Sequence, residues 1–314
     1  MTLSHMGRLV ALTTTVIFMF TGCGSQVAPT GGAMIASHAA HKMSGSSGAL
    51  IYATGGCGGI CVVSYPAGKL VDSISVSGEL GGDCADSAGN VFVTNNTEVL
   101  EYSHGGTSPI ATLSLPGDDA AGCSIDPGTG NLAVVFSESG ANVAVFPDAT
   151  GTPTTYESHI VSYYCGYDNA GNLFVSGLNG HQAGLSELPV GKSTFSVLSI
   201  NGTFDGFGQV QWDGKYVAVE GRNSDDIKVS RLQISGSIAS VVGETRFKGK
   251  LRNAFQSWIF GNRILIPYSS RGLQVNKISA WAYPKGGKPV IKFGQFGQSK
   301  FTKFAGVTLS PDAN

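Results

Sequence analysis

The chain has 314 residues, of which 13% are charged and 42% are hydrophobic, and its formal net charge is −1 at pH 7. So little charge excludes a disordered acidic or basic tail protein, and the apolar fraction is large enough for a real hydrophobic core. The 45 glycines, about twice the usual ~7%, show no Gly-X-Y period and therefore indicate many tight turns.

The first 22 residues are typical of an export signal. Arg8 precedes twelve mostly apolar residues, Leu9 to Phe20, a stretch too short to span a bilayer but suited to a secretory signal. Thr21-Gly22-Cys23 then resembles the lipobox of bacterial lipoproteins, which implies lipidation of Cys23; ordinary cleavage beside an incidental cysteine is the alternative. Residues 23–48 are small and polar, as in a flexible tether. We expect an extracytoplasmic, membrane-anchored lipoprotein of the bacterial cell envelope.

Five further cysteines follow Cys23, and export permits disulfides. Cys57 and Cys61 flank a short glycine-rich connection, so a local bridge across a hairpin mouth is the disulfide candidate. Cys84, Cys123 and Cys165 fall on three successive strands of the repeat described below. Neighbouring members of this series could lie close together, but we interpret all three as small apolar packing residues.

A repeated turn followed by an apolar run organises the chain. Asp86 to Val93, Asp126 to Val134 and Asp168 to Val175 each combine an aspartate, a Gly-Asn pair and a strand-like run, and their asparagines are 41 residues apart. Weaker copies occur at Asp213 and at Gly261-Asn262, and counting back 41 residues from Val91 leads to a similar strand at Leu50. The sequence therefore contains six starts of one repeat.

A second feature alternates with the first: an apolar strand ends near a proline or serine, and a glycine follows. Its six copies lie at Tyr65, Tyr102, Phe146, Leu188, Ile234 and Tyr283. From Tyr65 to Tyr283 there are 218 residues over five intervals, about 44 per repeat, which is the length of a four-stranded propeller blade.

The two ends of the chain predict how the ring closes. Residues 305–312 read like residues 121–127, an innermost strand, yet no further repeat follows them. The repeat that begins at Leu50 lacks this strand. We therefore predict an all-β, six-bladed β-propeller over residues 49–314, with four-stranded blades and a C-terminal strand that joins the first blade and removes an open edge.

The Asp-x-x-Gly-Asn-Leu/Val-Phe-Val runs resemble those of NHL-repeat and gluconolactonase-type six-bladed propellers. Together with the lipobox they resemble uncharacterised secreted bacterial lipoproteins of this fold. The resemblance covers the whole propeller but concerns the scaffold, and a scaffold does not assign a function.

The two faces of a propeller differ in their connections. Turns between strands one and two and between strands three and four lie on one face, here named the turn face, and all other connections lie on the connection face. Asp86, Asp126, Asp168 and Asp213 fall on the turn face, where we expect them to cap their own turns. The gluconolactonase resemblance implies a metal at the channel mouth, but Asp83 is the one carboxylate expected there. We therefore expect no metal and no cofactor.

Histidines suggest an enzymatic alternative. His159 and His181 are expected on the connection face of the fourth blade with Glu157 nearby, where they would suit a propeller lyase or hydrolase. Two exposed loop histidines without a chemical role are the other interpretation.

The charge distribution gives the sharper functional hypothesis. Residues 43–214 hold two basic and sixteen acidic side chains, whereas residues 215–304 hold sixteen basic and four acidic ones. Six basic residues are expected on connection-face loops, with four phenylalanines (293, 296, 301 and 304) interleaved: Arg246, Lys248, Lys250, Arg252, Lys300 and Lys303. We interpret the protein as a binding or scaffold protein for an anionic glycan, lipid or acidic protein, and expect no nucleic acid. A solubilising surface without a target is the alternative.

Overall fold

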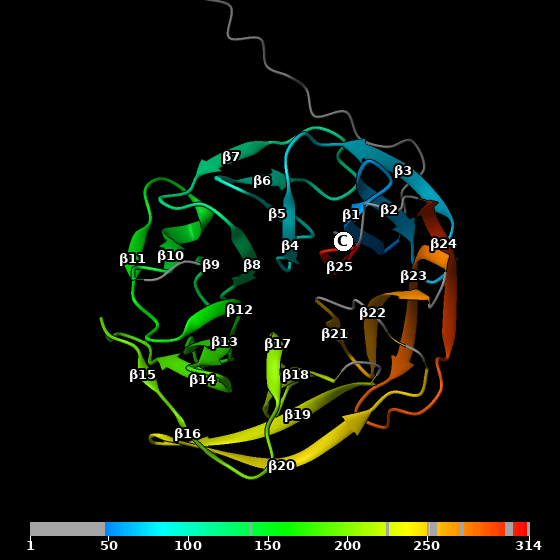
Figure 1. The fold of residues 1–314 in the computed structure, drawn as a ribbon. Coiled ribbons are helices and arrows are strands. Elements are labelled where there is room, and N and C mark those ends of the chain that lie inside the picture. The colour runs from blue at the N-terminus through cyan, green and yellow to red at the C-terminus, as the bar shows by residue number, and fades with distance from the viewer. Residues whose placement is uncertain are drawn as a thin grey trace, which may run out of the picture. The chain divides into compact units, whose positions relative to one another are not determined.

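The computed structural model describes residues 48–137, 140–223, 226–249, 251, 256–270, 273–298 and 304–312. Within them the chain forms six sheets arranged in a ring, and the strands of each sheet follow one another from the centre outward (Figure 1). A 3₁₀ turn, Pro147–Ala149, is the one helical element of the described residues. The predicted all-β, six-bladed propeller is confirmed.

Each blade is described from its inner to its outer strand. Blade one contains β25 (Gly306–Ser310), β1 (Leu50–Gly56), β2 (Gly59–Ser64) and β3 (Leu70–Ser75). Blade two contains β4 (Leu80–Ala85), β5 (Val91–Asn95), β6 (Glu98–Tyr102) and β7 (Ala111–Ser114). Blade three contains β8 (Ala120–Ile125), β9 (Leu132–Phe136), β10 (Val143–Phe146) and β11 (Thr154–Tyr156).

The remaining blades follow the same order. Blade four contains β12 (Val161–Tyr167), β13 (Leu173–Asn179), β14 (Gln182–Leu188) and β15 (Ser196–Val197). Blade five contains β17 (Gly206–Trp212), β18 (Val217–Asn223), β19 (Asp226–Ser235) and β20 (Ile238–Arg246), and β16 (Ser199–Asn201) adds a parallel fifth strand outside β20. Blade six contains β21 (Trp258–Phe260), β22 (Arg263–Ser270), β23 (Leu273–Ala282) and β24 (Ile291–Gln298).

Burial explains why the second strand of a blade is mostly apolar. Every residue of β5 and β9 is buried, because neighbouring blades cover both faces of the sheet, whereas most residues of the outer strand β3 are exposed. The buried apolar side chains form six clusters in the described residues, one at each junction between blades. The core is therefore a ring of contacts between blades, and hydrophobic burial holds neighbouring blades together.

The C-terminal strand closes the ring as predicted. β25 pairs with β1 in antiparallel register from Leu50 opposite Ser310 to Thr54 opposite Gly306. The Ser310 hydroxyl donates to the carbonyl of Gly89 at 2.5 Å and lies 2.7 Å from Nδ1 of His104, so blade two also holds this strand. In the described part of the chain, no helix has the length and apolar character needed to cross a bilayer.

Candidate functional site

The aspartates of the turn face cap their own turns. Asp86 accepts from the backbone N–H of Asn90 at 2.8 Å, Asp168 from that of Asn172 at 2.9 Å, and Asp213 from that of Tyr216 at 2.7 Å. The acceptor in each case is Oδ1, and Oδ1 of Asp126 likewise accepts from the backbone N–H of Gly128 at 3.0 Å. The capping role predicted for these side chains is confirmed, and it leaves them a structural function.

The side chain of Gln256 joins blade two from the segment just before blade six. Its Oε1 accepts from the backbone N–H of Asp83 at 3.0 Å, and its Nε2 donates to the Asp83 carbonyl. A Cβ at Gly82 would lie 2.0 Å from Oε1 and one at Gly306 would lie 2.7 Å from it, so both positions require glycine. The amide therefore fills a slot between the innermost strands of blades one and two.

The Asp83 carboxyl group lies beside this slot and is fully buried. Neither of its oxygens has a hydrogen-bond partner among the described residues, and burial raises its pKa well above the ordinary value. Burial disfavours the charged form of this carboxyl group, and the group cannot reach a ligand at the surface. No group of three or more metal-ligating side chains occurs in the described residues.

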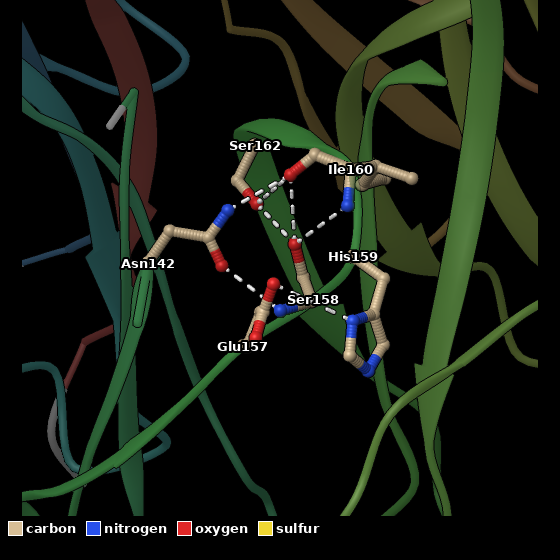
Figure 2. A network of polar contacts seen from close by, with 6 residues as sticks. All are labelled: Asn142, Glu157, Ser158, His159, Ile160 and Ser162. Carbon is tan, nitrogen blue, oxygen red and sulfur yellow. Dashed lines mark hydrogen bonds and ion pairs between the residues drawn. The ribbon is translucent and has the colours of Figure 1, made fainter. Parts of the chain in front are cut away.

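His159 lies on the connection before blade four, beside a buried polar network (Figure 2). Ser158 and Ser162 are fully buried, their hydroxyl oxygens are 2.8 Å apart, and Ser158 Oγ also donates to the Ile160 carbonyl at 3.0 Å. Asn142 accepts from the Ser158 backbone N–H at 2.9 Å and donates to the Ile160 carbonyl at 2.8 Å. The network fixes this connection and engages both serine hydroxyls.

The imidazole itself lies outside the network. His159 Nδ1 is 3.6 Å from Oε1 of Glu157, and both side chains are at least half exposed. Its backbone is left-handed, with φ of 64°, a conformation that costs energy in a residue with a Cβ. His181 lies in the turn between β13 and β14, at the end of the blade from which the His159 connection enters, because Val161 pairs with Leu178. The two histidines therefore both lie on the connection face of blade four. The ion pair of His159 is with Glu157.

The cysteines correct one interpretation. Cys84 and Cys123 are joined by a disulfide between the inner strands of blades two and three, with Cα atoms 5.7 Å apart, so the packing role assigned to them is wrong. Cys165 is buried and unpaired, as a packing residue would be. Cys57 and Cys61 are also bonded, across the connection from β1 to β2. The Cys84–Cys123 disulfide, here named the inner disulfide, links two blades covalently, whereas the Cys57–Cys61 disulfide lies within a single hairpin.

The basic residues that follow blade five lie beside a turn of blade six. The backbone N–H of Lys248 donates to the carbonyl of Gly287 at 2.6 Å, and the N–H of Gly287 donates to the carbonyl of Arg246 at 3.0 Å. Gly287 belongs to the turn between β23 and β24, so this segment pairs with a turn of the turn face. The twist of the long outer strands brings the end of β20 to this position.

This junction gathers exposed lysines, which we name the basic rim: Lys248, Lys285, Lys288 and Lys292, all exposed, with Arg246 beside them. Arg246 is paired with Glu244 at 2.6 Å. Lys292 lies in strand β24. The phenylalanines expected to interleave with the lysines are instead core residues: Phe293, Phe296 and Phe304 are 5%, 4% and 1% exposed. Lys250, Arg252, Lys300, Phe301, Lys303 and the whole segment 1–47, including Cys23, lie outside the described residues.

Lys228 of blade five forms ion pairs with two carboxylates within the protein. Lys228 is 8% exposed, and its Nζ lies 2.6 Å from Oε1 of Glu244 and 3.0 Å from Oδ1 of Asp205. Burial alone would lower the pKa of Lys228, but its hydrogen bonds to Glu244 and Asp205 outweigh this effect and raise it. Lys228 therefore has a structural role, although nothing in the residues around it along the chain distinguishes it from the exposed lysines.

Comparison with known proteins agrees with the fold. No family model and no curated protein matches the chain. A protein of unknown function from Bacteroides caccae is similar over 84% of this chain and 99% of its own, with a TM-score of 0.63 and 14% identity. A functionally unknown protein from Desulfotomaculum acetoxidans is similar over 83% of this chain and 99% of its own, with a TM-score of 0.53 and 16% identity.

A chain of a nidogen/laminin complex covers 85% of this chain and 99% of its own, with a TM-score of 0.55 and 14% identity. Identities this low show the propeller fold alone, and the function has to be argued from the site.

Proposed function

We propose that this protein is a lipid-anchored, extracytoplasmic propeller that binds an anionic surface through its basic rim. The observation that carries the proposal is the backbone pairing of Lys248 with Gly287, which places the end of blade five beside a turn with two exposed lysines, Lys285 and Lys288. Like charges gathered at one surface raise the local potential and attract anions.

The entry point of the tether favours the membrane as that surface. Leu50 begins β1 opposite Ser310, the last residue of β25, so the tether joins blade one on the turn face. Lys285 and Lys288 lie on a turn of the same face in the next blade. A lipid at Cys23 would hold this face near a bilayer, and a single acyl chain binds only marginally without a second contact. Basic side chains near an anionic bilayer each contribute about 1 kcal/mol, so the rim would serve as that contact.

The finer relationship to NHL-repeat and gluconolactonase-type propellers forms part of this proposal. It is supported by the repeated aspartate turns, since in each of four blades an aspartate accepts a hydrogen bond from a backbone N–H of its own turn. This relationship would explain the scaffold of the protein, whereas the proposed binding role depends on the basic rim.

Vesicle capture tests the role of the rim. With the full chain carrying Cys23→Ser, so that no lipid contributes, we expect capture by phosphatidylglycerol vesicles at low salt and its loss near physiological ionic strength, where the Debye length falls to ~8 Å. Reversal of Lys248, Lys285 and Lys288 to Glu should lower capture at least ~100-fold, since about 1 kcal/mol is lost for each lysine removed.

Single reversals provide the matched control. Lys192 lies in the corresponding turn of acidic blade four and is also exposed, so Lys192→Glu should leave capture unchanged while Lys288→Glu weakens it. Equal loss in both variants, or capture that survives the triple reversal, would overturn the membrane contact. Retention on a polyuronate or an acidic protein in place of vesicles would assign the rim to a glycan or a protein partner. Mass spectrometry of the mature amino terminus tests the lipid at Cys23.

A second candidate function rests on the strained backbone of His159. Its conformation is fixed by the buried serines, and Glu157 lies beside its ring, as in an acid–base pair. His159→Ala should abolish any lyase or hydrolase turnover without affecting vesicle capture. Turnover that persists in this variant would exclude the catalytic role.

A further inference from the structure

A cavity of about 500 Å³ lies between blades four and five, apart from the basic rim. Blade four contributes Asp168, Phe174 and Glu187 to its lining, and blade five contributes Trp212, Lys215 and Ile234. The wall thus combines carboxylates with an indole ring. Its charged members are Asp168, Glu187 and Lys215.

The carboxyl group of Glu187 is the unexplained feature of this cavity. Glu187 is 9% exposed, yet it forms no hydrogen bond or ion pair with the described residues around it. Burial raises its pKa, and the nearby Asp168 raises it further. Its carboxyl oxygens open onto the cavity, so a ligand that supplies a positive charge and N–H donors there would bind the group favourably.

Neither of the other charged residues that line the cavity, Asp168 and Lys215, forms a hydrogen bond or ion pair with Glu187. Asp168 accepts hydrogen bonds from the backbone N–H groups of Ala170 and Asn172, both at 2.9 Å, and from the Asn172 side chain at 2.8 Å, so its position is fixed by its own turn. The Lys215 ammonium group lies 5.1 Å from the centre of the Tyr216 ring and is exposed. The lining therefore carries a net negative charge that no described side chain pairs.

Trp212 provides the other half of a cation site. It is half-buried, lines the cavity and ends β17, so its ring is held by a strand of the scaffold. The face of an indole ring is the most favourable aromatic surface for a cation. A carboxylate and an indole in one cavity form a pair suited to an organic cation, which has both charge and apolar surface.

The repeat supplies an internal comparison. Glu101 lies opposite Phe92 in blade two just as Glu187 lies opposite Phe174 in blade four, and burial followed by repulsion from Asp86 likewise raises the pKa of Glu101. The residue before the turn aspartate of the next blade differs. It is Ile125 after blade two and Trp212 after blade four. The acidic pair thus occurs twice, but an aromatic ring accompanies it only at the junction of blades four and five.

We propose that the cavity between blades four and five binds an organic cation through a primary ammonium or guanidinium group, which lies between the Glu187 carboxylate and the Trp212 indole. This site is independent of the basic rim and of the lipid anchor. The cation is either a free amine or a side chain of a partner protein, because both present the same chemistry.

Calorimetric titration of the full chain at low salt tests the site with three probes: putrescine, N-acetyl-lysine amide and N-acetyl-arginine amide. Glu187→Gln keeps the shape of the side chain and removes its charge, and should weaken binding at least tenfold. Trp212→Phe should weaken it less, by about threefold to tenfold, since phenylalanine keeps a weaker aromatic face. Glu101→Gln is the matched control and should bind as the wild type does.

The outcomes separate as follows. Binding of putrescine alone assigns a free amine, and binding of the lysine or arginine amide alone assigns a protein side chain; either supports the site. Acidification through the raised pKa of Glu187 should weaken binding of the wild type but not that of Glu187→Gln. Full binding by Glu187→Gln, equal loss in Glu101→Gln, or no binding of any probe at millimolar concentration would overturn the proposal. Circular dichroism of each variant shows whether the ring is intact.

Discussion

Lys228 in blade five and Glu187 in blade four are ionisable side chains of nearly equal burial, 8% and 9% exposed, with opposite surroundings. Lys228 has two carboxylate partners, within 2.6 and 3.0 Å of its ammonium nitrogen. Glu187 faces a cavity and has a like charge, Asp168, nearby. A buried charge that is paired holds the fold together, whereas one left unpaired at a cavity is a candidate for binding.

The two halves of the ring also differ in how neighbouring blades are joined. Blades two and three share the Cys84–Cys123 disulfide. Blades five and six are linked by a hydrogen bond from the Tyr283 hydroxyl to Asp213 at 2.8 Å and by the backbone pairing at Gly287. A covalent link on one side and polar contacts on the other predict that the two junctions respond differently to mutation.

Removal of the inner disulfide should give the largest loss of stability. Cys84 and Cys123 are 39 residues apart, and closing a loop of that length is expected to stabilise the domain by about 2–4 kcal/mol through the unfolded state. Cys84→Ala combined with Cys123→Ala should lower the free energy of unfolding by this amount in urea titrations. Cys57→Ala with Cys61→Ala, which opens a loop of four residues, should cost roughly 2 kcal/mol less. Equal losses in the two variants would contradict the account.

Loss of the paired cation should have a smaller effect. Lys228→Met leaves Glu244 and Asp205 without their shared partner, which should cost about 1–3 kcal/mol near neutral pH. The hydrogen bond from Lys228 lowers the pKa of Glu244 below its ordinary value of 4.5. Its stabilisation is therefore present above pH 4.5 and is lost as the pH falls through the lowered pKa. The stability difference between wild type and variant should shrink accordingly in acid, and a difference independent of pH would show that the pair contributes nothing.

The comparison also shows which features the sequence could reveal. Blade number and closure follow from local signals that recur about every 41 residues, such as the turns at Asp86 and Asp168, so they were predictable. The Cys84–Cys123 bond was missed because register shifts between Leu80 and Asp83 and between Ala120 and Gly122 determine which side chains of the inner strands face one another. A bulge of this kind leaves no clear mark in sequence periodicity.

The candidate sites were less predictable for a related reason. Glu187 and Trp212 are separated by a whole blade-to-blade connection, and only the packing of blades four and five places them around one cavity. Arg246 and Lys248 were expected on connection-face loops, but twisted outer strands bring them beside a turn of the opposite face. Charge segregation along the chain was visible in the sequence, whereas the pairing of Lys228 and the isolation of Glu187 depend on the folded ring.

The most direct test of the contrast between Lys228 and Glu187 is the titration of Glu187 by carbon-detected NMR, with Glu187→Gln used to assign its carboxyl signal. In the free protein we expect a pKa above the ordinary glutamate value of 4.5, because the group is buried beside Asp168. Saturation with the best-binding amine should lower this pKa, because a cation in the cavity stabilises the carboxylate. A pKa at or below 4.5 in the free protein, or one that the amine does not move, would contradict the account.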